Sequence, residues 1–229
     1  MEQEQQYYLR AEPSEEGRKF LRRHQEHLQS LFHDLRLSPR LTKADDLHWT
    51  ALFLGSPRRW SRALRVAGYR AKNVSADDLV RLAWTARERL RAETAAHRPE
   101  GLLGYPTAYD VFFPGKTNAV FVLRLSHMES VIAILLRAVQ ETLRDWEGTG
   151  KIPAGIAANL FAHAAFPLAR ERSGGKPHVT LARGRVSRPR QRDVLRSLRA
   201  APLAARDPIA FTRADIRVVS SSAIIDPHA

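Results

Sequence analysis

The sequence has 229 residues, 44% of them hydrophobic and 27% charged, which is ordinary for a chain that folds around its own core. It has no cysteine, which excludes disulfides and thiolate chemistry, so we expect a reducing, cytoplasmic location. Basic residues number 37 against 24 acidic ones. The resulting net charge of +13 favours a polyanionic partner such as RNA or a nucleotide phosphate.

Two features qualify these inferences. Only six of the basic residues are lysines, so the arginine excess also fits a simple compositional bias. The N-terminus is acidic, and no apolar run approaches the ~18 residues of a membrane span. We therefore expect no signal peptide and no membrane partner. Separately, we expect a monomer whose ends, residues 1–5 and 223–229, are flexible.

Hydrophobic periodicity and turn residues predict alternating strands and helices along the chain. Strands are expected over 6–10, 47–55, 107–114, 118–126, 177–185 and 209–222, with 159–169 as a further candidate. Helices are expected over 12–35, 60–66, 75–96, 129–147 and 188–201, and a loop over 147–158. Hairpin-like strand pairs favour an α+β fold with antiparallel sheets in a single domain, residues 1–229.

Two helices carry specific signals. Ser75 and Asp78 have the spacing of a capping box at the start of the helix over 75–96. In the first helix, apolar residues recur at steps of three and four and predict the buried face. That face comprises Phe20, His24, Leu28, Leu31 and Leu35.

A histidine and a threonine two residues apart open two of the expected strands, in "LHWTALFLG" and "PHVTLARG". Side chains alternate along a strand, so His48 and Thr50 share one face, as do His178 and Thr180. Alternation places Trp49 and Phe53 on the opposite, apolar face. If the two strands face one another, they bring two imidazoles and two hydroxyls together.

That set of groups suits phosphodiester hydrolysis without a metal or cofactor. One neutral imidazole can take a proton from the attacking water, and the other, protonated, can give one to the departing ribose oxygen. The hydroxyls can donate to the non-bridging phosphate oxygens. Chance supplies roughly 0.4 such triplets in this composition, so one alone is weak. Strand-start histidines bonded to loops remain the structural alternative.

The two phrases resemble the two signatures of the 2H phosphoesterases, most closely the branch of 2′-5′ RNA ligases or RNA 2′,3′-cyclic phosphodiesterases. "FFP" at Phe112–Pro114 and "IRVVSSS" at Ile216–Ser222 also lie where that branch has an F-P pair and a terminal strand. The resemblance implies two pseudo-symmetric α+β lobes around a central cleft. It also implies opening of 2′,3′-cyclic phosphates to 2′-phosphates, with weak reversible 2′-5′ ligation.

By this resemblance His48 and His178 are the catalytic pair, with His178 as base and His48 as acid, and Thr50 and Thr180 hold the phosphate. Arg183 takes the family's arginine place, but alternation puts it opposite His178 unless the strand ends or bulges there. Other candidate substrate-binding residues lie near the motifs. They are Lys176, Arg172, Tyr8 and Arg10.

The sequence departs from the family in a polar first strand, a long 147–176 segment and the lack of an aromatic C-terminal segment. These differences affect substrate choice more than chemistry. The alternatives are a small-nucleotide substrate (2′-5′ oligoadenylate, a cyclic dinucleotide or an ADP-ribose cyclic phosphate) or a non-catalytic nucleotide- or RNA-binding module. The run "ARGRVSRPRQR" is either a phosphate-tracking patch or a solvated helix start. His24 and His27 have no third ligand at a telling spacing, so no metal site is expected.

Overall fold

The computed structural model describes residues 5–66, 74–95, 102–160 and 177–220. The predicted α+β class with antiparallel strands is confirmed. The strands are β1 (Tyr7–Pro13), β2 (Arg40–Leu41), β3 (Trp49–Gly55), β4 (Leu102–Phe112), β5 (Asn118–Ser126), β6 (His178–Arg185) and β7 (Ile209–Ser220). The helices are α1 (Glu15–Asp34), α2 (Pro57–Val66), α3 (Ala76–Ala95), α4 (Glu129–Gly148), α5 (Ile156–Leu160) and α7 (Arg188–Ala200), with a 3-10 turn at Ala44–Asp46.

The strands run in the order β2-β6-β3-β1-β7-β4-β5, and β6 pairs with β5 as well. The sheet therefore consists of two halves, β3-β1-β7 and β4-β5-β6, that meet at two seams. One seam is the short pairing of β3 with β6 at Trp49 and Val179. The other joins β4 to β7, from Leu102 paired with Phe211 to Gly104 paired with Ile209.

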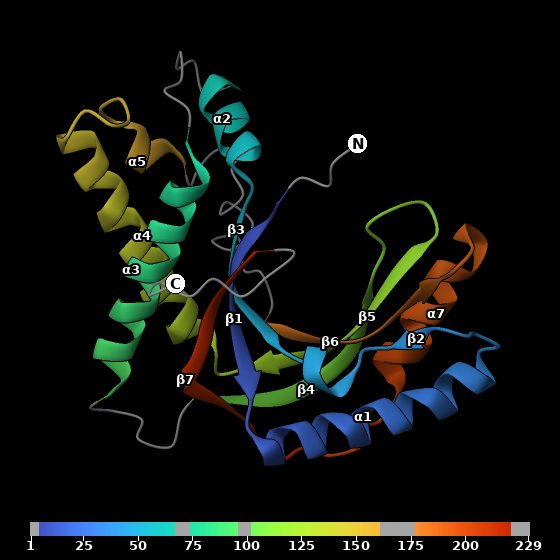
Figure 1. The fold of residues 1–229 in the computed structure, drawn as a ribbon. Coiled ribbons are helices and arrows are strands. Elements are labelled where there is room, and N and C mark those ends of the chain that lie inside the picture. The colour runs from blue at the N-terminus through green and yellow to red at the C-terminus, as the bar shows by residue number, and fades with distance from the viewer. Residues whose placement is uncertain (1–4, 67–73, 96–101, 161–176, 221–229) are drawn as a thin grey trace.

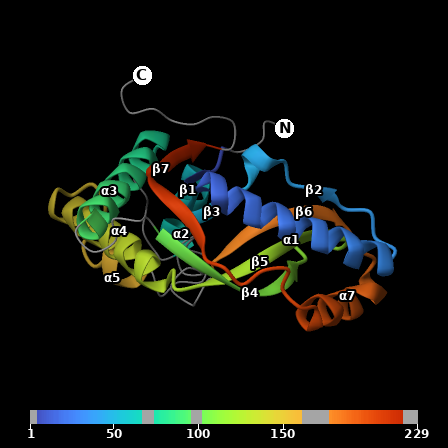
Figure 2. The ribbon, with the colours of Figure 1, turned by 90° about the horizontal axis from the view of Figure 1, so that it is seen from below.

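The helices form two groups. Helices α3 and α4 pack against β1, β3 and β7, whereas α7 packs against β4 and α1 packs against β7, β6 and β1. Figures 1 and 2 show α3, α4 and α5 on one side of the strands and α1 and α7 on the other. Within the described residues, no helix is long and apolar enough to cross a bilayer.

The core lies on the helix-covered face of the sheet. Trp49 from the first seam and Phe211 from the second are fully buried, with ring centroids 6.0 Å apart. Leu9 on β1 and Leu123 on β5 belong to the same buried face. The opposite face carries half-buried polar residues, and we call it the polar face. Its members include Arg10, Thr50, Arg124 and Thr180.

Several sequence-based expectations need correction. Residues 156–160 form α5, so the end of the predicted loop and the start of the 159–169 candidate strand were wrong; residues 161–169 lie outside the described part. Strand β4 begins at Leu102, five residues before the expected start. In α1 the buried residues are Gly17, Leu21, His24, Gln25, Leu28 and Phe32, a face rotated from the predicted one.

The predicted capping box is confirmed. The Asp78 backbone NH donates to Ser75 Oγ at 3.2 Å, and the Ser75 backbone NH donates to Asp78 Oδ2 at 3.0 Å. This reciprocal pair satisfies two amide donors at the start of α3 that the helix itself leaves without partners.

Candidate active site

The two histidine–threonine motifs lie on neighbouring antiparallel strands. Trp49 on β3 pairs with Val179 on β6, and extending this register by one residue sets His48 opposite Thr180 and Thr50 opposite His178. Trp49 and Val179 are buried while the four flanking residues are half-buried, so all four side chains point to the polar face. The two histidines are diagonal neighbours, with backbones about 7–8 Å apart by sheet geometry.

A β-bulge follows each motif. On β3, Arg10 pairs with Thr50 and Leu9 with Leu52, so Ala51 is the extra residue. On β6, Val122 pairs with Thr180 and Phe121 with Ala182, which leaves Leu181 extra. In both strands the two residues after the threonine are buried and the next residue is not.

The bulges change which face the later residues occupy. Arg183 is exposed and pairs with Val120, two residues from the Val122 that pairs with Thr180, so it lies on the polar face with His178. Phe53 likewise pairs with Tyr8 and is half-buried on the polar face. Simple alternation was therefore wrong for both residues, because each bulge adds one residue to its strand.

The His48 imidazole is oriented by the preceding turn. Its Nδ1 donates to the Asp46 carbonyl oxygen at 2.7 Å, which in the neutral ring leaves a lone pair on Nε2. Burial lowers the pKa of His48 and outweighs the opposing effect of the Asp46 carbonyl, and the positive charge of Arg10 lowers that pKa further. His48 is therefore neutral near pH 7.

The His178 ring is flanked by residues from β4 and β5. The Phe112 ring meets it edge-on at 5.0 Å between centroids, and the Arg124 guanidinium lies 4.6 Å from the Phe112 centroid. Arg124 is also the direct cross-strand partner of His178. Phe112 is the first residue of the "FFP" phrase, which is part of the resemblance to the 2H phosphoesterases described above.

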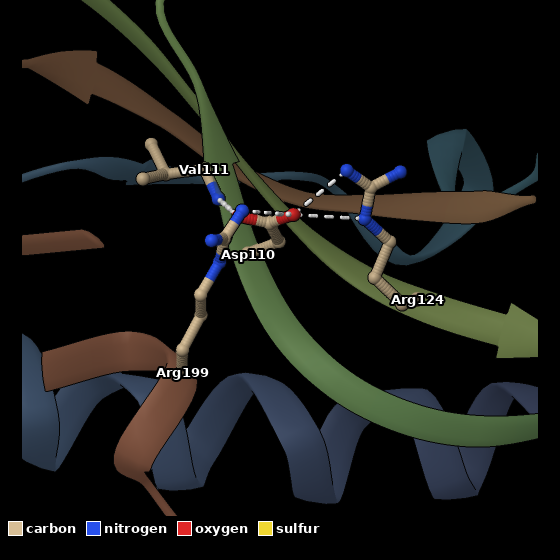
Figure 3. A network of polar contacts seen from close by, with 4 residues as sticks. All are labelled: Asp110, Val111, Arg124 and Arg199. Atoms are coloured by element: carbon tan, nitrogen blue, oxygen red, sulfur yellow. Dashed lines mark hydrogen bonds and ion pairs between the residues drawn. The ribbon is translucent and has the colours of Figure 1, made fainter. Parts of the chain in front are cut away.

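Arg124 is held by a carboxylate. Its Nε and Nη2 donate to Asp110 Oδ2 at 3.0 and 2.7 Å, and Arg199 of α7 reaches Asp110 Oδ1 at 3.3 Å (Figure 3). The Val111 amide donates to the same carboxylate at 2.9 Å. Burial alone would raise the pKa of Asp110, but these hydrogen bonds, Arg124 first, bring it below its ordinary value.

Strands β1 and β7 add further arginines to the polar face. Arg10 pairs with Thr50 on one side and with Arg217 on the other. Arg10 donates to the Asp45 carbonyl through Nη2, and its buried Nε forms an ion pair with Glu12 Oε1 at 3.4 Å. The Tyr8 ring lies parallel to that of His48, with centroids 6.1 Å apart.

The predicted site residues thus fall into two groups. His48, Thr50, His178, Thr180, Arg183, Tyr8 and Arg10 all belong to the polar face, whereas Arg172 and Lys176 lie outside the described residues. Sequence reasoning missed Arg124 and Arg217. The available signal for Arg124 was its position as one charged residue between the buried Leu123 and Leu125 on β5. Arg217 had a similar signal beside the buried Val218.

The described residues contain no group of three or more histidine, cysteine or carboxylate side chains that could hold a metal ion. Two imidazoles beside two hydroxyls, framed by arginines, can instead exchange protons with a bound phosphoester and neutralise its charge.

No protein-family model and no curated protein matches the sequence. Solved structures similar to this chain include Usb1 of Kluyveromyces marxianus, 10% identical over 96% of this chain and 95% of that one, with a TM-score of 0.48. Thermus thermophilus TT0787 is 18% identical, covering 90% and 81%, with a TM-score of 0.39. E. coli LigT complexed with 3′-AMP is 16% identical, covering 98% and 96%, with a TM-score of 0.37. At these values the similarities assign no activity.

Proposed function

We propose that this protein is a 2H phosphoesterase that opens nucleoside or RNA 2′,3′-cyclic phosphates to 2′-phosphates. The observation that carries the proposal is the pairing of Trp49 with Val179, which sets the two histidine–threonine motifs side by side on one face. Weak 2′-5′ ligation would use the same groups with a 5′-hydroxyl in place of water: the bond from O5′ to phosphorus forms while one imidazole takes its proton, and the bond to O3′ breaks as before.

In the proposed reaction a water oxygen attacks phosphorus while one imidazole takes its proton. The bond between phosphorus and O3′ breaks, and the second imidazole gives its proton to O3′. The product carries a 2′-phosphate and a free 3′-hydroxyl. Thr50 and Thr180 donate to the non-bridging oxygens, where negative charge builds. Both proton transfers are supplied by side chains, so the chemistry needs no metal.

The surroundings of His48 favour it as the base, which reverses the roles expected from the family resemblance. Its lowered pKa keeps it neutral near pH 7, and the hydrogen bond from Nδ1 to the Asp46 carbonyl leaves Nε2 as the proton acceptor. His178 is then the acid that protonates O3′.

Leaving-group chemistry tests these roles. His48→Ala and His178→Ala should each reduce turnover of a 2′,3′-cyclic nucleotide by about 10²–10⁴-fold. A nucleoside p-nitrophenyl phosphodiester needs no proton on its leaving group, so His178→Ala should largely retain activity on it and His48→Ala should not. The opposite pattern would reverse the assignment. The matched control is His33→Ala, because the His33 side chain is 93% exposed.

A substrate panel tests the class of ligand. Activity on 2′,3′-cyclic nucleotides and cyclic-ended RNA, undiminished by EDTA, supports the proposal. Turnover confined to 2′-5′ oligoadenylate, cyclic dinucleotides or an ADP-ribose cyclic phosphate would show the small-nucleotide alternative instead. Binding without turnover of any of them would show a non-catalytic module.

A further inference from the structure

Positive charge is unevenly distributed over the fold. Residues 178–200, which contain β6 and α7, hold seven arginines and one aspartate, and so contribute +6 to the net charge of +13. Helices α3 and α4 together hold six arginines and eight carboxylates. A general compositional preference for arginine does not explain this contrast, because it would raise the charge of both regions alike.

The arginines of α7 follow one side of the helix. Val194 and Leu198 are buried and fix the orientation of α7. Four arginines, spaced by four, four and three positions, lie along the largely opposite side of the helix, and all are exposed. We call them the α7 arginine stripe, and they are Arg188, Arg192, Arg196 and Arg199. From first to last they extend about 16 Å along the helix axis.

The stripe has few anionic partners among the described residues. Arg196 lies 3.7 Å from the exposed Asp193, and Arg199 lies 3.3 Å from Asp110. Arg188 and Arg192 form no ion pair with any described residue. Exposed pairs such as that of Arg196 contribute little stability, so the stripe is not explained by the fold it sits on.

The stripe reaches the candidate active site at its C-terminal end. Its N-terminal end follows the far end of β6, the strand that His178 opens, and the exposed Arg183 near that end lies on the polar face and pairs with Arg40 of β2. At its C-terminal end, Arg199 and Arg124 share the Asp110 carboxylate (Figure 3), and Arg124 pairs with His178. Figures 1 and 2 place α7 on the side away from α3 and α4.

We propose that the α7 arginine stripe binds the backbone phosphates of a single RNA strand whose cyclic-phosphate end lies at the two histidines. The inference rests on the proposed function and narrows its substrate to RNA ends. Guanidinium groups match phosphate geometry, and the stripe is long enough to follow several nucleotides. Among the described residues, the exposed large hydrophobics are Val66 and Tyr105, and neither is on α7, so the stripe lacks the apolar anchors of a membrane-binding helix.

The test compares two substrates of one site. The triple variant Arg188→Gln, Arg192→Gln, Arg196→Gln should raise KM about tenfold for a ten-nucleotide RNA ending in a 2′,3′-cyclic phosphate. Its kcat/KM for 2′,3′-cyclic CMP should stay within about twofold of the wild type, because a mononucleotide does not reach the stripe. The matched control neutralises three exposed arginines of α3 and α4. It is Arg81→Gln, Arg137→Gln, Arg144→Gln, and it should leave both substrates unchanged.

Salt dependence gives a second readout. Each lost contact to a single strand reduces the slope of log K against log salt by about 0.7, so the triple variant should lose about 2 from that slope. An unchanged KM for RNA, or an equal loss on both substrates, would overturn the proposal. If the wild type turns over neither substrate, the proposed function fails. Fluorescence anisotropy with a 3′-phosphate-ended RNA then still tests the stripe through the same salt slope.

Discussion

Acidification from pH 6.5 toward pH 4 should destabilise the fold through one buried histidine outside the candidate site. His24 is fully buried on α1, and its Nδ1 lies 2.7 Å from the Tyr109 hydroxyl. That hydroxyl accepts from the Ala204 amide at 3.2 Å, so its own proton is directed to His24 Nδ1, which acts as acceptor only in the neutral ring. Burial, and then the neighbouring His27, lower the pKa of His24 from 6.5 to about 4.

The sign and size of the effect follow from linkage. Unfolded His24 takes up a proton near pH 6.5, while folded His24 resists it until about pH 4. The stability due to the neutral ring is therefore complete above pH 6.5 and is lost as the pH falls through this window. At about 1.4 kcal/mol per pKa unit, the loss is about 3 kcal/mol.

Urea unfolding followed by tryptophan fluorescence between about pH 7.5 and 4 measures this loss. His24→Phe should cost about 1–3 kcal/mol at neutral pH, because the Tyr109 hydroxyl loses its acceptor. The same substitution should also make the free energy of unfolding less dependent on pH. His33→Gln, at an exposed position, should keep the full wild-type dependence. If His24→Phe retained the wild-type slope, the pKa argument for His24 would be refuted.

Two further predictions concern the candidate site. Arg10 lowers the pKa of His48 and Glu12 raises it, so Arg10→Gln and Glu12→Gln should move one limb of the kcat/KM profile in opposite directions, to higher and lower pH respectively. If His48 is the base, the limb that moves is the acidic one; movement of the alkaline limb would contradict that role. Asp110→Asn should lower the free energy of unfolding by about 1–3 kcal/mol, because Arg124 loses its bidentate partner, and urea titration measures this. The Asp193 side chain, which pairs with Arg196, is 72% exposed, so Asp193→Asn should change the free energy of unfolding by less than about 0.5 kcal/mol.

The sequence predicts well what depends on local periodicity. The face shared by His48 and Thr50 follows from the two-residue repeat of a strand, and the capping box of Ser75 follows from a three-residue spacing. The buried face of α1 was harder to predict. Its polar residues His24 and Gln25 are buried because Tyr109 and the backbone carbonyls of Thr42 and Leu181 bond them, and those partners are remote in sequence.

Pairings between distant segments could not be predicted in the same way. No local pattern sets Trp49 beside Val179, or gathers Asp110, Arg124 and Arg199 from three elements. The bulges had a signal that alternation alone overlooks. In both motifs two adjacent apolar residues follow the threonine, Ala51 with Leu52 and Leu181 with Ala182, and both members of each pair are buried.

The repeated bulge also shows how a pseudo-symmetric backbone can serve an asymmetric substrate. The third residue after the threonine is Phe53 in the first motif and Arg183 in the second, and both lie on the polar face. On the first side, Phe53 pairs with Tyr8, whose ring lies parallel to His48. On the second side, Arg124 is the cross-strand partner of His178, and Arg183 follows Thr180 on the same face. Under the proposed function, an aromatic side suits a nucleobase and a guanidinium side suits phosphates. The ribose would then bind in one direction only. Two similar histidines can keep fixed roles, one as acid and one as base, only if the substrate binds in a single direction.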